Sequence, residues 1–545
     1  MGSEISMNAI RWPLVAAVAA VALLALPACS GSSDSDNAAP PKAVELTTEV
    51  AKPSGPVDSI TWNLSGEPNT LDPAKQFANV TAVVGNLCEG LMRFGKDYGL
   101  QSALAEKVTQ PDDKTWVFDL RANVTFWDGQ PVTPEDVVFS VERTIAPATA
   151  SSWAAAYQNL RSVGKTGPHQ VTFRFREPDS MFRWFQASPS TYVTEKRFTE
   201  RAGKEYGSAT GGIMCTGPYK VGAWRSGQDI TVVANDRYWG EQPLVKSARF
   251  TFDSDPASRT AALLRGDVDG AFDNPVSALA KLKSSGEGDL LFGKSLAPVF
   301  LSTFVNDPGI THQNVRKALA KLVDYAGIAQ SVYGGAAIPI KQLTPEATWG
   351  YSTSIFKSAY DALPEPKQDL DEAKRLVKEA GDVPPLTIAY DSSAQESKIA
   401  LSLQSTAKQV GLRINLKALS STDFLKIFYD PKIREGLSGY ILSGSLSFPE
   451  PLEYDEFATT GSYYNYAGYH NAQYDALLKR ARTTLDDDKR AELIVQAEKL
   501  RDQDGYNVPI VSPYLNVFVN KRLTGLAPAS YNRATPWLTK LGAAG

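Results

Sequence analysis

The chain has 545 residues, of which 43% are hydrophobic and 21% are charged, and its formal net charge is -4 at pH 7. This length is too great for one hydrophobic core and predicts two or three compact units. The composition is that of an ordinary globular protein, and the slight negative charge gives no reason to expect nucleic acid as a partner.

The N-terminus has the pattern of an export signal. Arg11 precedes an apolar run from Pro13 to Leu26, which is too short to span a membrane as a mature helix and suits the core of a signal peptide. Cys29 follows a small residue, as in a lipobox. We therefore expect residues 1–28 to be a lipoprotein signal peptide and Cys29 to carry a lipid anchor. The alternative is a secretory signal cut elsewhere, with Cys29 incidental.

The next segment predicts a spacer followed by the first ordered elements. Residues 29–56 are rich in Ser, Asp, Ala, Pro and Lys, which predicts a disordered tether. Polar and apolar residues then alternate from Ser59 to Leu64, as in a strand, and a turn at Ser65 to Pro68 ends it. An apolar helical pattern follows from Val80 to Arg93.

Two cysteines remain once Cys29 is lipidated, namely Cys88 and Cys215. In an exported protein a single pair usually forms a disulfide, so we expect a bond between them. Two buried free thiols are the alternative.

Two further segments have clear local patterns. Thr133, followed by Pro134 and Asp136, predicts a helix start with an N-cap, a proline at the first helical position and an acid in the first turn. The stretch from Cys215 to Gly240 predicts a β-hairpin with Gly227 in its turn, and it ends in an aromatic pair.

These segments resemble, in order, the signature segments of the family 5 extracellular solute-binding proteins, the peptide and nickel receptors of ABC importers. The strand-turn-helix block around Thr133 carries the resemblance first. The other matches are SGEPNTLDP at 65–73, EGLMRF at 89–94, TGPYKVGAW at 216–224, NDRYW at 235–239, RTAALLRGDVDGA at 259–271, NVRKALAKLVD at 314–324, DEAKRLVKEAG at 371–381, YHNAQYDALLKRAR at 469–482 and VPI at 508–510. Together they span nearly the whole expected mature chain.

The pattern of elements and the resemblance predict the same fold class. Strand-like runs such as 386–390 and 413–419 alternate with amphipathic helices such as 370–380 and 398–410, which favours α/β layers. The resemblance implies a two-lobed periplasmic-binding-protein-like II fold with an extra subdomain inserted in the first lobe. The bounds that we expect are lobe I at 57–300, with the subdomain at about 91–209, lobe II at 301–504, and a C-terminal return to lobe I at 505–545.

The sequence contains no motif that indicates catalysis. The run GDLLFGKS at 288–295 matches a P-loop pattern, but no strand precedes it and no helix follows, so we reject it. The three histidines are dispersed, and neither a Ser nucleophile with a base nor a metal-ligand spacing is evident. We therefore expect no enzyme, no cofactor and no metal.

The hydroxyl-rich and aromatic segment from 440 to 469 is the best candidate for ligand contact. The residues that we select in it are Tyr440, Ser445, Ser447, Phe448 and Tyr464. In peptide receptors of the resembled family, an acid in this loop pairs with the amino terminus of the peptide. Ser447 stands in that place, so the acid is absent unless Glu450 or Glu453 substitutes. The absence leaves room for modified peptides, sugars or other amphipathic solutes.

The topology of the resembled family also implies which residues lie on the first-lobe side of the expected cleft. The positions expected there are Ser65, Glu67, Thr216, Gly217, Tyr219, Phe304 and Asn306. For each, packing within a turn or at a strand edge is the alternative, and for Glu67 a role in stabilising the turn.

The resemblance implies a monomeric, lipid-anchored receptor on the extracytoplasmic face of the cell membrane. It would bind a peptide or another small solute between two lobes and deliver it to an ABC permease with its cytoplasmic ATPase. A lipoprotein of the same fold that acts as a scaffold or regulator in envelope assembly is the alternative.

Overall fold

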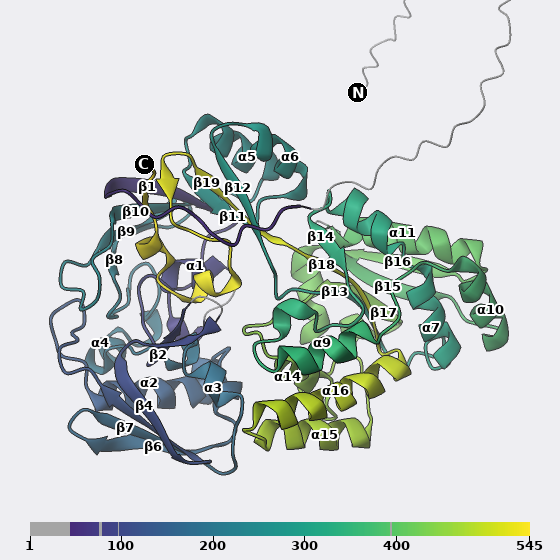
Figure 1. Ribbon diagram of the computed structural model, residues 1–545, viewed down its shortest axis with the longest axis horizontal. Helices are drawn as coiled ribbons and strands as arrows, with labels where there is room; N and C mark the ends of the chain where they lie inside the picture. The colour runs from purple at the N-terminus through teal and green to yellow at the C-terminus, as the bar shows by residue number, and fades with distance from the viewer. Residues whose placement is uncertain (1–43, 76–78, 96–97, 393–394) are drawn as a thin grey trace, which may run out of the picture. The chain divides into compact units, whose positions relative to one another are not determined.

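The computed structural model describes residues 44–75, 79–95, 98–392 and 395–545, and two mixed β-sheets organise this part of the chain (Figure 1). The predicted signal peptide and Cys29 lie outside the described residues. Among the residues that are described, no helix is long and apolar enough to cross a membrane.

The first sheet contains seven strands, and its central strand is the first in the chain. β1 (Val57–Leu64) pairs in parallel with β10 and with β11, so the strand predicted at 59–64 is confirmed. The other strands are β8 (Tyr219–Arg225), β9 (Asp229–Ala234), β10 (Val245–Phe252), β11 (Gly270–Phe272), β12 (Gly288–Gly293) and β19 (Leu515–Asn520). The predicted hairpin is formed by β8 and β9, with Gly227 at a φ of 75° in its turn.

The chain leaves the first sheet after β1 and builds a subdomain before it returns at β8. Its four-stranded antiparallel sheet contains β4 (Ala105–Asp112), β5 (Thr115–Leu120), β6 (Leu160–Gly167) and β7 (Gln170–Phe175). α2 (Pro134–Ile145) packs beside this sheet and begins in a capping box between Thr133 and Asp136, as the sequence predicts. Short elements complete it: β2 (Met92–Phe94), β3 (Leu100–Ser102), α3 (Phe182–Phe185) and α4 (Lys196–Ala202).

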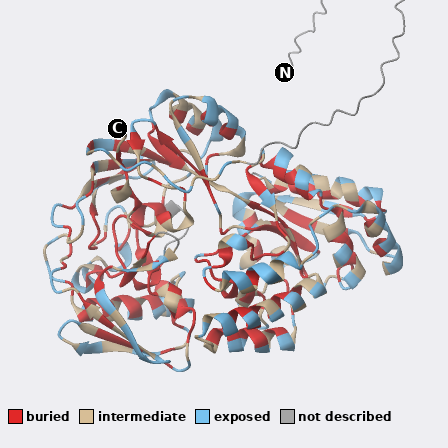
Figure 2. Cartoon of the chain, in the orientation of Figure 1, coloured by how far each residue is buried: buried red, intermediate tan, exposed pale blue. Residues whose placement is uncertain are grey.

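The second sheet contains six strands and belongs to the second lobe. Its strands are β13 (Val299–Thr303), β14 (Ala337–Pro339), β15 (Leu386–Asp391), β16 (Ile414–Leu419), β17 (Gly439–Ser443) and β18 (Asn507–Pro513). Its helices include α7 (Gln313–Leu322), α10 (Leu370–Ala380), α11 (Glu396–Gln409), α15 (Ala472–Thr483) and α16 (Asp487–Asp504). Gly381 and Gly411 follow α10 and α11 with positive φ, as predicted for helix ends. Figure 2 shows that the strands of both sheets are largely buried.

Within the described residues the chain crosses between the two sheets twice. The first crossing joins β12 to β13 through residues 294–298, and the second joins β18 to β19 at Tyr514. By sheet membership the return to the first lobe therefore comes later than the boundary expected at 505, because β18 completes the second sheet beside β13. The P-loop-like run at 288–295, which we reject from its sequence, falls on β12 and is followed by β13.

A disulfide joins Cys88 and Cys215 across 127 positions of sequence, as predicted. The helix predicted from Val80 to Arg93 is wrong in extent, because α1 ends at Val84 and Cys88 lies in the irregular segment beyond it. Gly85 follows the last helical residue and lies against the C-terminal segment, since a Cβ at this position would lie 2.6 Å from the carbonyl oxygen of Arg533.

The disordered tether predicted for residues 29–56 is wrong for its last part, residues 44–56. The Thr47 amide donates to the carbonyl of Phe292 at 2.8 Å, and the Ser54 amide donates to that of Ala543 at 2.9 Å. Val44 and Leu46 pack against buried side chains of both lobes. Alternating apolar residues in this segment therefore bind it to the folded body, although its composition is typical of a spacer.

Candidate functional site

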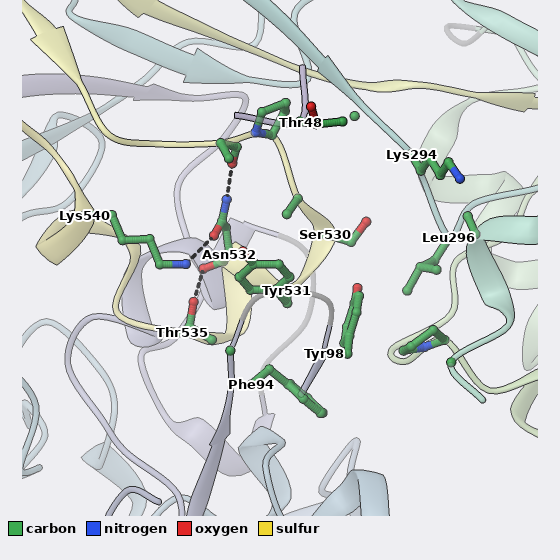
Figure 3. Close-up of a pocket in the computed structure, with 18 of the residues that line it drawn as sticks. Thr48, Phe94, Tyr98, Lys294, Leu296, Ser530, Tyr531, Asn532, Thr535 and Lys540 are labelled. Atoms are coloured by element: carbon green, nitrogen blue, oxygen red, sulfur yellow. Dashed lines mark hydrogen bonds between the residues drawn. The ribbon is translucent and has the colours of Figure 1, made fainter. Parts of the chain in front are cut away.

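A cavity of about 840 Å³, here called the inner cavity, lies between the two lobes. The second lobe contributes β17 and the loop after it. The first lobe contributes residues 529–534, here called the loop 529–534, which contain the short 3-10 helix Ser530–Ala534. A second cavity of about 1260 Å³, the outer cavity, shares Phe94, Leu296 and residues 529–531 with it (Figure 3). The two cavities therefore adjoin at these shared residues.

The second lobe gives the inner cavity a set of rings, here called the aromatic wall. Its members are Phe428, Tyr440, Phe448, Tyr464 and Tyr466. The ring centroids of Phe428 and Tyr466 lie 5.2 Å apart, and Tyr464 is 42% exposed. Ser445 and Ser447 line the same cavity and add hydroxyl groups. The wall thus offers flat apolar faces with polar edges, which suits an amphipathic solute.

The structure brings together five of the predicted contact residues in this wall and its loop. They are Tyr440, Ser445, Ser447, Phe448 and Tyr464. They meet because β17 ends at Ser443 and the chain beyond it folds along the edge of the inner cavity.

Neither candidate substitute for the missing acid lines the inner cavity. The Glu453 carboxylate accepts hydrogen bonds from the backbone amides of Ser447, at 3.1 and 3.0 Å, and of Phe448, at 3.2 Å. Burial raises the pKa of Glu453 to about 7. Glu450 is fully buried and accepts from the Trp184 indole at 2.9 Å and the Tyr351 hydroxyl at 2.7 Å. Both carboxylates therefore hold the loop in shape from behind.

The charged residues that do line the inner cavity come from other segments. Asp273 and Arg533 form an ion pair with each other at its first-lobe side. Arg501 is 1% exposed and pairs with buried Asp455, whose pKa burial raises to about 7. The Nε and Nη2 atoms of Arg501 have no hydrogen-bond partner among the described residues. The inner cavity thus contains no acidic side chain that lacks a basic partner in the part of the chain described.

Thr216, Gly217 and Tyr219 were expected to face the cleft, and the structure corrects this. Thr216 is buried and its hydroxyl donates to Glu89 at 3.1 Å, while the Tyr219 hydroxyl donates to the carbonyl of Val245 at 2.9 Å. A Cβ on Gly217 would lie 2.4 Å from the carbonyl oxygen of Leu87. None of the three lines either cavity. The hydroxyls of Thr216 and Tyr219 bind partners inside the first lobe, and the backbone at Gly217 packs closely against that of Leu87.

Glu89 is the centre of that packing. Besides Thr216, it accepts from the Tyr238 hydroxyl at 2.8 Å and the Trp239 indole at 2.9 Å, and burial raises its pKa. The disulfide lies beside it in sequence at Cys88. We call Cys88, Glu89 and the stretch from Cys215 to Gly240 the bracing hub.

The remaining predicted positions also lie outside the two cavities. Glu67 accepts from the Trp224 indole at 2.7 Å and the Gly227 amide at 2.9 Å, so it holds the β8–β9 turn. Phe304 packs against Tyr440 with centroids 5.5 Å apart, behind the aromatic wall. Asn306 is exposed. Ser65 lines a recess of about 20 Å³ beside the Asp273–Arg533 pair.

The loop 529–534 is the part of the cleft that the sequence did not reveal. It includes Ser530, Tyr531 and Asn532, and the Asn532 backbone carbonyl accepts from the Thr535 hydroxyl (Figure 3). Its residues carry no periodic pattern or motif, and they reach the cleft only because β19 returns the chain to the first sheet. No local signal in the sequence identifies them.

The inserted subdomain also contacts the second lobe directly, through contacts here called the latch. Asp179 accepts from Arg482 at 2.8 and 3.0 Å, and both side chains are buried. Trp184 donates to Glu450, and its ring stacks on Phe448 with an interplanar angle of 15°. A buried ion pair with several hydrogen bonds fixes geometry even where its net contribution to stability is small.

No group of three or more His, Cys, Asp and Glu side chains that suits a metal ion occurs among the described residues. Two of the histidines have structural partners. His312 accepts from the Asn314 amide at the start of α7, and the His470 ring contacts the Thr460 hydroxyl at 2.7 Å.

Comparisons with known proteins agree with this geometry. A family model described as bacterial extracellular solute-binding proteins, family 5 Middle, matches residues 99–466. The probable D,D-dipeptide-binding periplasmic protein DdpA of Escherichia coli (strain K12) is 26% identical over 496 residues, which are 87% of this chain and 92% of that protein.

Two solved structures show the same fold. The ABC transporter substrate-binding protein CtaP of Listeria monocytogenes has a TM-score of 0.79 at 22% identity, covering 90% of this chain and 99% of that one. The Haemophilus influenzae OppA complex with the peptide RPPGFSPFR has a TM-score of 0.73 at 22% identity, covering 89% and 99%. The predicted two-lobed architecture with an inserted subdomain is thereby confirmed.

Proposed function

Because the chain belongs to the bacterial extracellular solute-binding proteins of family 5, receptors of ABC importers that are not enzymes, we propose that it captures peptides between its two lobes. The observation that carries the proposal is the inner cavity, with the aromatic wall on one side and the loop 529–534 on the other. Rings and hydroxyls accept varied side chains while backbone groups hold an extended chain. The OppA relative that binds RPPGFSPFR supports a peptide.

Closure is the mechanism that we infer. The chain crosses between the sheets only at 294–298 and at Tyr514 in the part described, so these segments are the hinges. A ligand that contacts both lobes binds the closed form more tightly and shifts the population toward it. The latch residues Asp179 and Arg482 belong to that closed form. The permease recognises this form, and a separate ATPase drives transport.

The location follows from the N-terminal pattern. Cleavage after residue 28 and lipidation of Cys29 anchor the receptor on the extracytoplasmic face of the membrane. Residues 44–56 bind to the folded body and are therefore not part of the tether. The receptor acts as a monomer.

One observation favours a second candidate, a receptor for a solute without a free amino group. The inner cavity offers no carboxylate lacking a basic partner among the described residues, since Asp273 pairs with Arg533 and Glu453 lies behind the wall. A peptide's α-ammonium then has no counter-charge there. N-modified peptides or other amphipathic solutes avoid this cost.

Native mass spectrometry of the protein purified without added ligand tests the proposal. A series of co-purifying masses that fragment as peptides supports it, and one defined mass without peptide fragmentation supports the second candidate. Adding a peptide pool should also compact the scattering profile as the lobes close. A uniformly empty protein whose scattering profile is unchanged by any peptide pool would falsify the peptide function.

A further inference from the structure

The outer cavity has a basic side that the proposed function does not yet use. Arg93, on β2, and Lys540, near the C-terminus, both line it from the first lobe. Figure 3 shows Lys540 beside Asn532 and Tyr531, at the opposite side of the cavity from Lys294. The shared residues Phe94 and Tyr531 connect this basic side with the inner cavity.

The Lys540 ammonium lies in a setting that favours an anion. It donates to Asn532 Oδ1 at 2.9 Å and lies 4.5 Å from the centroid of the Tyr531 ring, and these contacts leave donor capacity unused. Burial, together with the positive charge of Arg93, lowers the pKa of Lys540 to about 8. Arg93 is the charged group that acts on it, and no ion pair joins Lys540 to a carboxylate in the described part of the chain.

The other two basic residues that line the outer cavity in the described part of the chain have acidic partners. Lys294 pairs with Glu346 at 2.8 Å. Glu89, in the bracing hub, attracts Arg93, but three donors already bind its carboxylate and burial raises its pKa. Lys357 pairs with Asp361 at 2.6 Å, and the acidic lining residues besides Glu346 are Glu49 and Glu241. Arg93 and Lys540 are therefore the basic lining residues that form no ion pair with a carboxylate among the described residues.

We propose that Arg93 and Lys540 form an anion subsite that binds a carboxylate of the ligand while the aromatic wall holds the ligand's apolar part. The proposal rests on the proposed function for the identity of the ligand but not for the subsite itself. An anion between two cations gains Coulomb attraction in a partly desolvated cavity and relieves the repulsion between them. The receptor then selects solutes that are acidic at one end, the C-terminal carboxylate of a peptide or an acidic side chain.

The first arm of the test uses inorganic phosphate as a probe, with sodium chloride of equal ionic strength as the reference. Phosphate should raise the melting temperature of the wild-type protein and of the control variant Lys294→Met. Lys294 lines the same cavity but is already paired with Glu346. Phosphate should not raise the melting temperature of Lys540→Met, but it should raise that of Lys540→Arg, which keeps the positive charge. Equal shifts in Lys540→Met and wild type would overturn the subsite.

The second arm measures affinity by calorimetry for peptides with a free or an amidated C-terminus, and for Glu or Gln side chains within amidated peptides. Amidation should weaken binding to wild type at least tenfold and should not change binding to Lys540→Met. An effect of Glu against Gln instead identifies a side-chain carboxylate as the anion. Peptides that bind wild type with no dependence on either carboxylate refute the subsite and leave the peptide function standing. If phosphate raises the melting temperature but no peptide binds, the subsite is supported and the peptide function is refuted.

Discussion

The bracing hub and the aromatic wall contain similar residue types but use them in opposite ways. In the hub, the polar tips of Thr216, Tyr238 and Trp239 all point to Glu89, and little of them is exposed. In the wall, Tyr464 is 42% exposed and its ring lines a cavity. A tyrosine or tryptophan whose polar tip has an internal partner stabilises the fold, whereas one that faces a cavity is available to a ligand.

The largest expected effect comes from breaking the hub's covalent bond. Replacing Cys88 and Cys215 together with Ser should lower the free energy of unfolding by about 4 kcal/mol, because the bond closes a long loop in the unfolded chain. Urea unfolding measures the change, and reduced wild type is the control. Ligand preferences should stay the same. An altered preference would show that the hub contributes to the ligand site.

The second prediction removes the hub's acceptor. Glu89→Gln should lower the free energy of unfolding by about 2 to 3 kcal/mol, because an amide cannot accept all the hydrogen bonds that the buried carboxylate accepts. Glu67→Gln is the matched control, with a loss below about 1 kcal/mol, because Glu67 lies in a surface turn. Thermal unfolding of wild type, Glu89→Gln and Glu67→Gln measures the two losses of stability. Similar losses in the two variants contradict a special role for Glu89.

The third prediction acts on the wall. Tyr464→Ala should weaken ligand binding by about 1 kcal/mol, or fivefold, with a stability change within about 0.5 kcal/mol, because its ring is partly exposed. Tyr429→Ala is the control, since Tyr429 is 61% exposed and lines neither cavity. Calorimetry with the co-purified ligand measures both. Equal losses for the two variants would show that the wall makes no specific contact.

The fourth prediction concerns pH and is the smallest. The pKa of Glu453 rises from the usual 4.5 to about 7 in the folded protein, so the folded state holds this proton more tightly than the unfolded state. Its contribution to stability is full below pH 4.5 and is lost as the pH rises through 7. Relative to Glu453→Gln, wild type should lose stability by about 1 kcal/mol between pH 5 and pH 8, after allowance for partial solvent access. If the unfolding free energies of wild type and Glu453→Gln depend on pH in the same way, the raised pKa of Glu453 is contradicted.

The fold was largely predictable because its signals are local. Helix α10 was predicted with both ends correct, since Gly381 ends it and its apolar residues recur at helical spacing. The helix through Cys88 was predicted too long, since beyond Val84 the carbonyls of Asn86 and Leu87 accept hydrogen bonds from the amides of Tyr219 and Gly217, far along the chain. Local patterns do not report such a contact.

The candidate site was predictable only on one side. Tyr440, Ser447 and Tyr464 fall in one segment whose composition alone indicates a binding loop. Thr216 carries an equally suggestive hydroxyl, yet its partner Glu89 fixes it inside the hub. Lys540 shows the converse, because its lack of a carboxylate partner among the described residues is visible only in the folded structure.

Hydrogen exchange with and without ligand tests the central claim most directly, namely that the solute binds between the aromatic wall and the loop 529–534. Ligand should slow amide exchange in residues 440–469 and 529–534, with no change in the hub strand β8 (Tyr219–Arg225), which lines neither cavity. Protection confined to the hub, with none in the wall or the loop, would contradict the account.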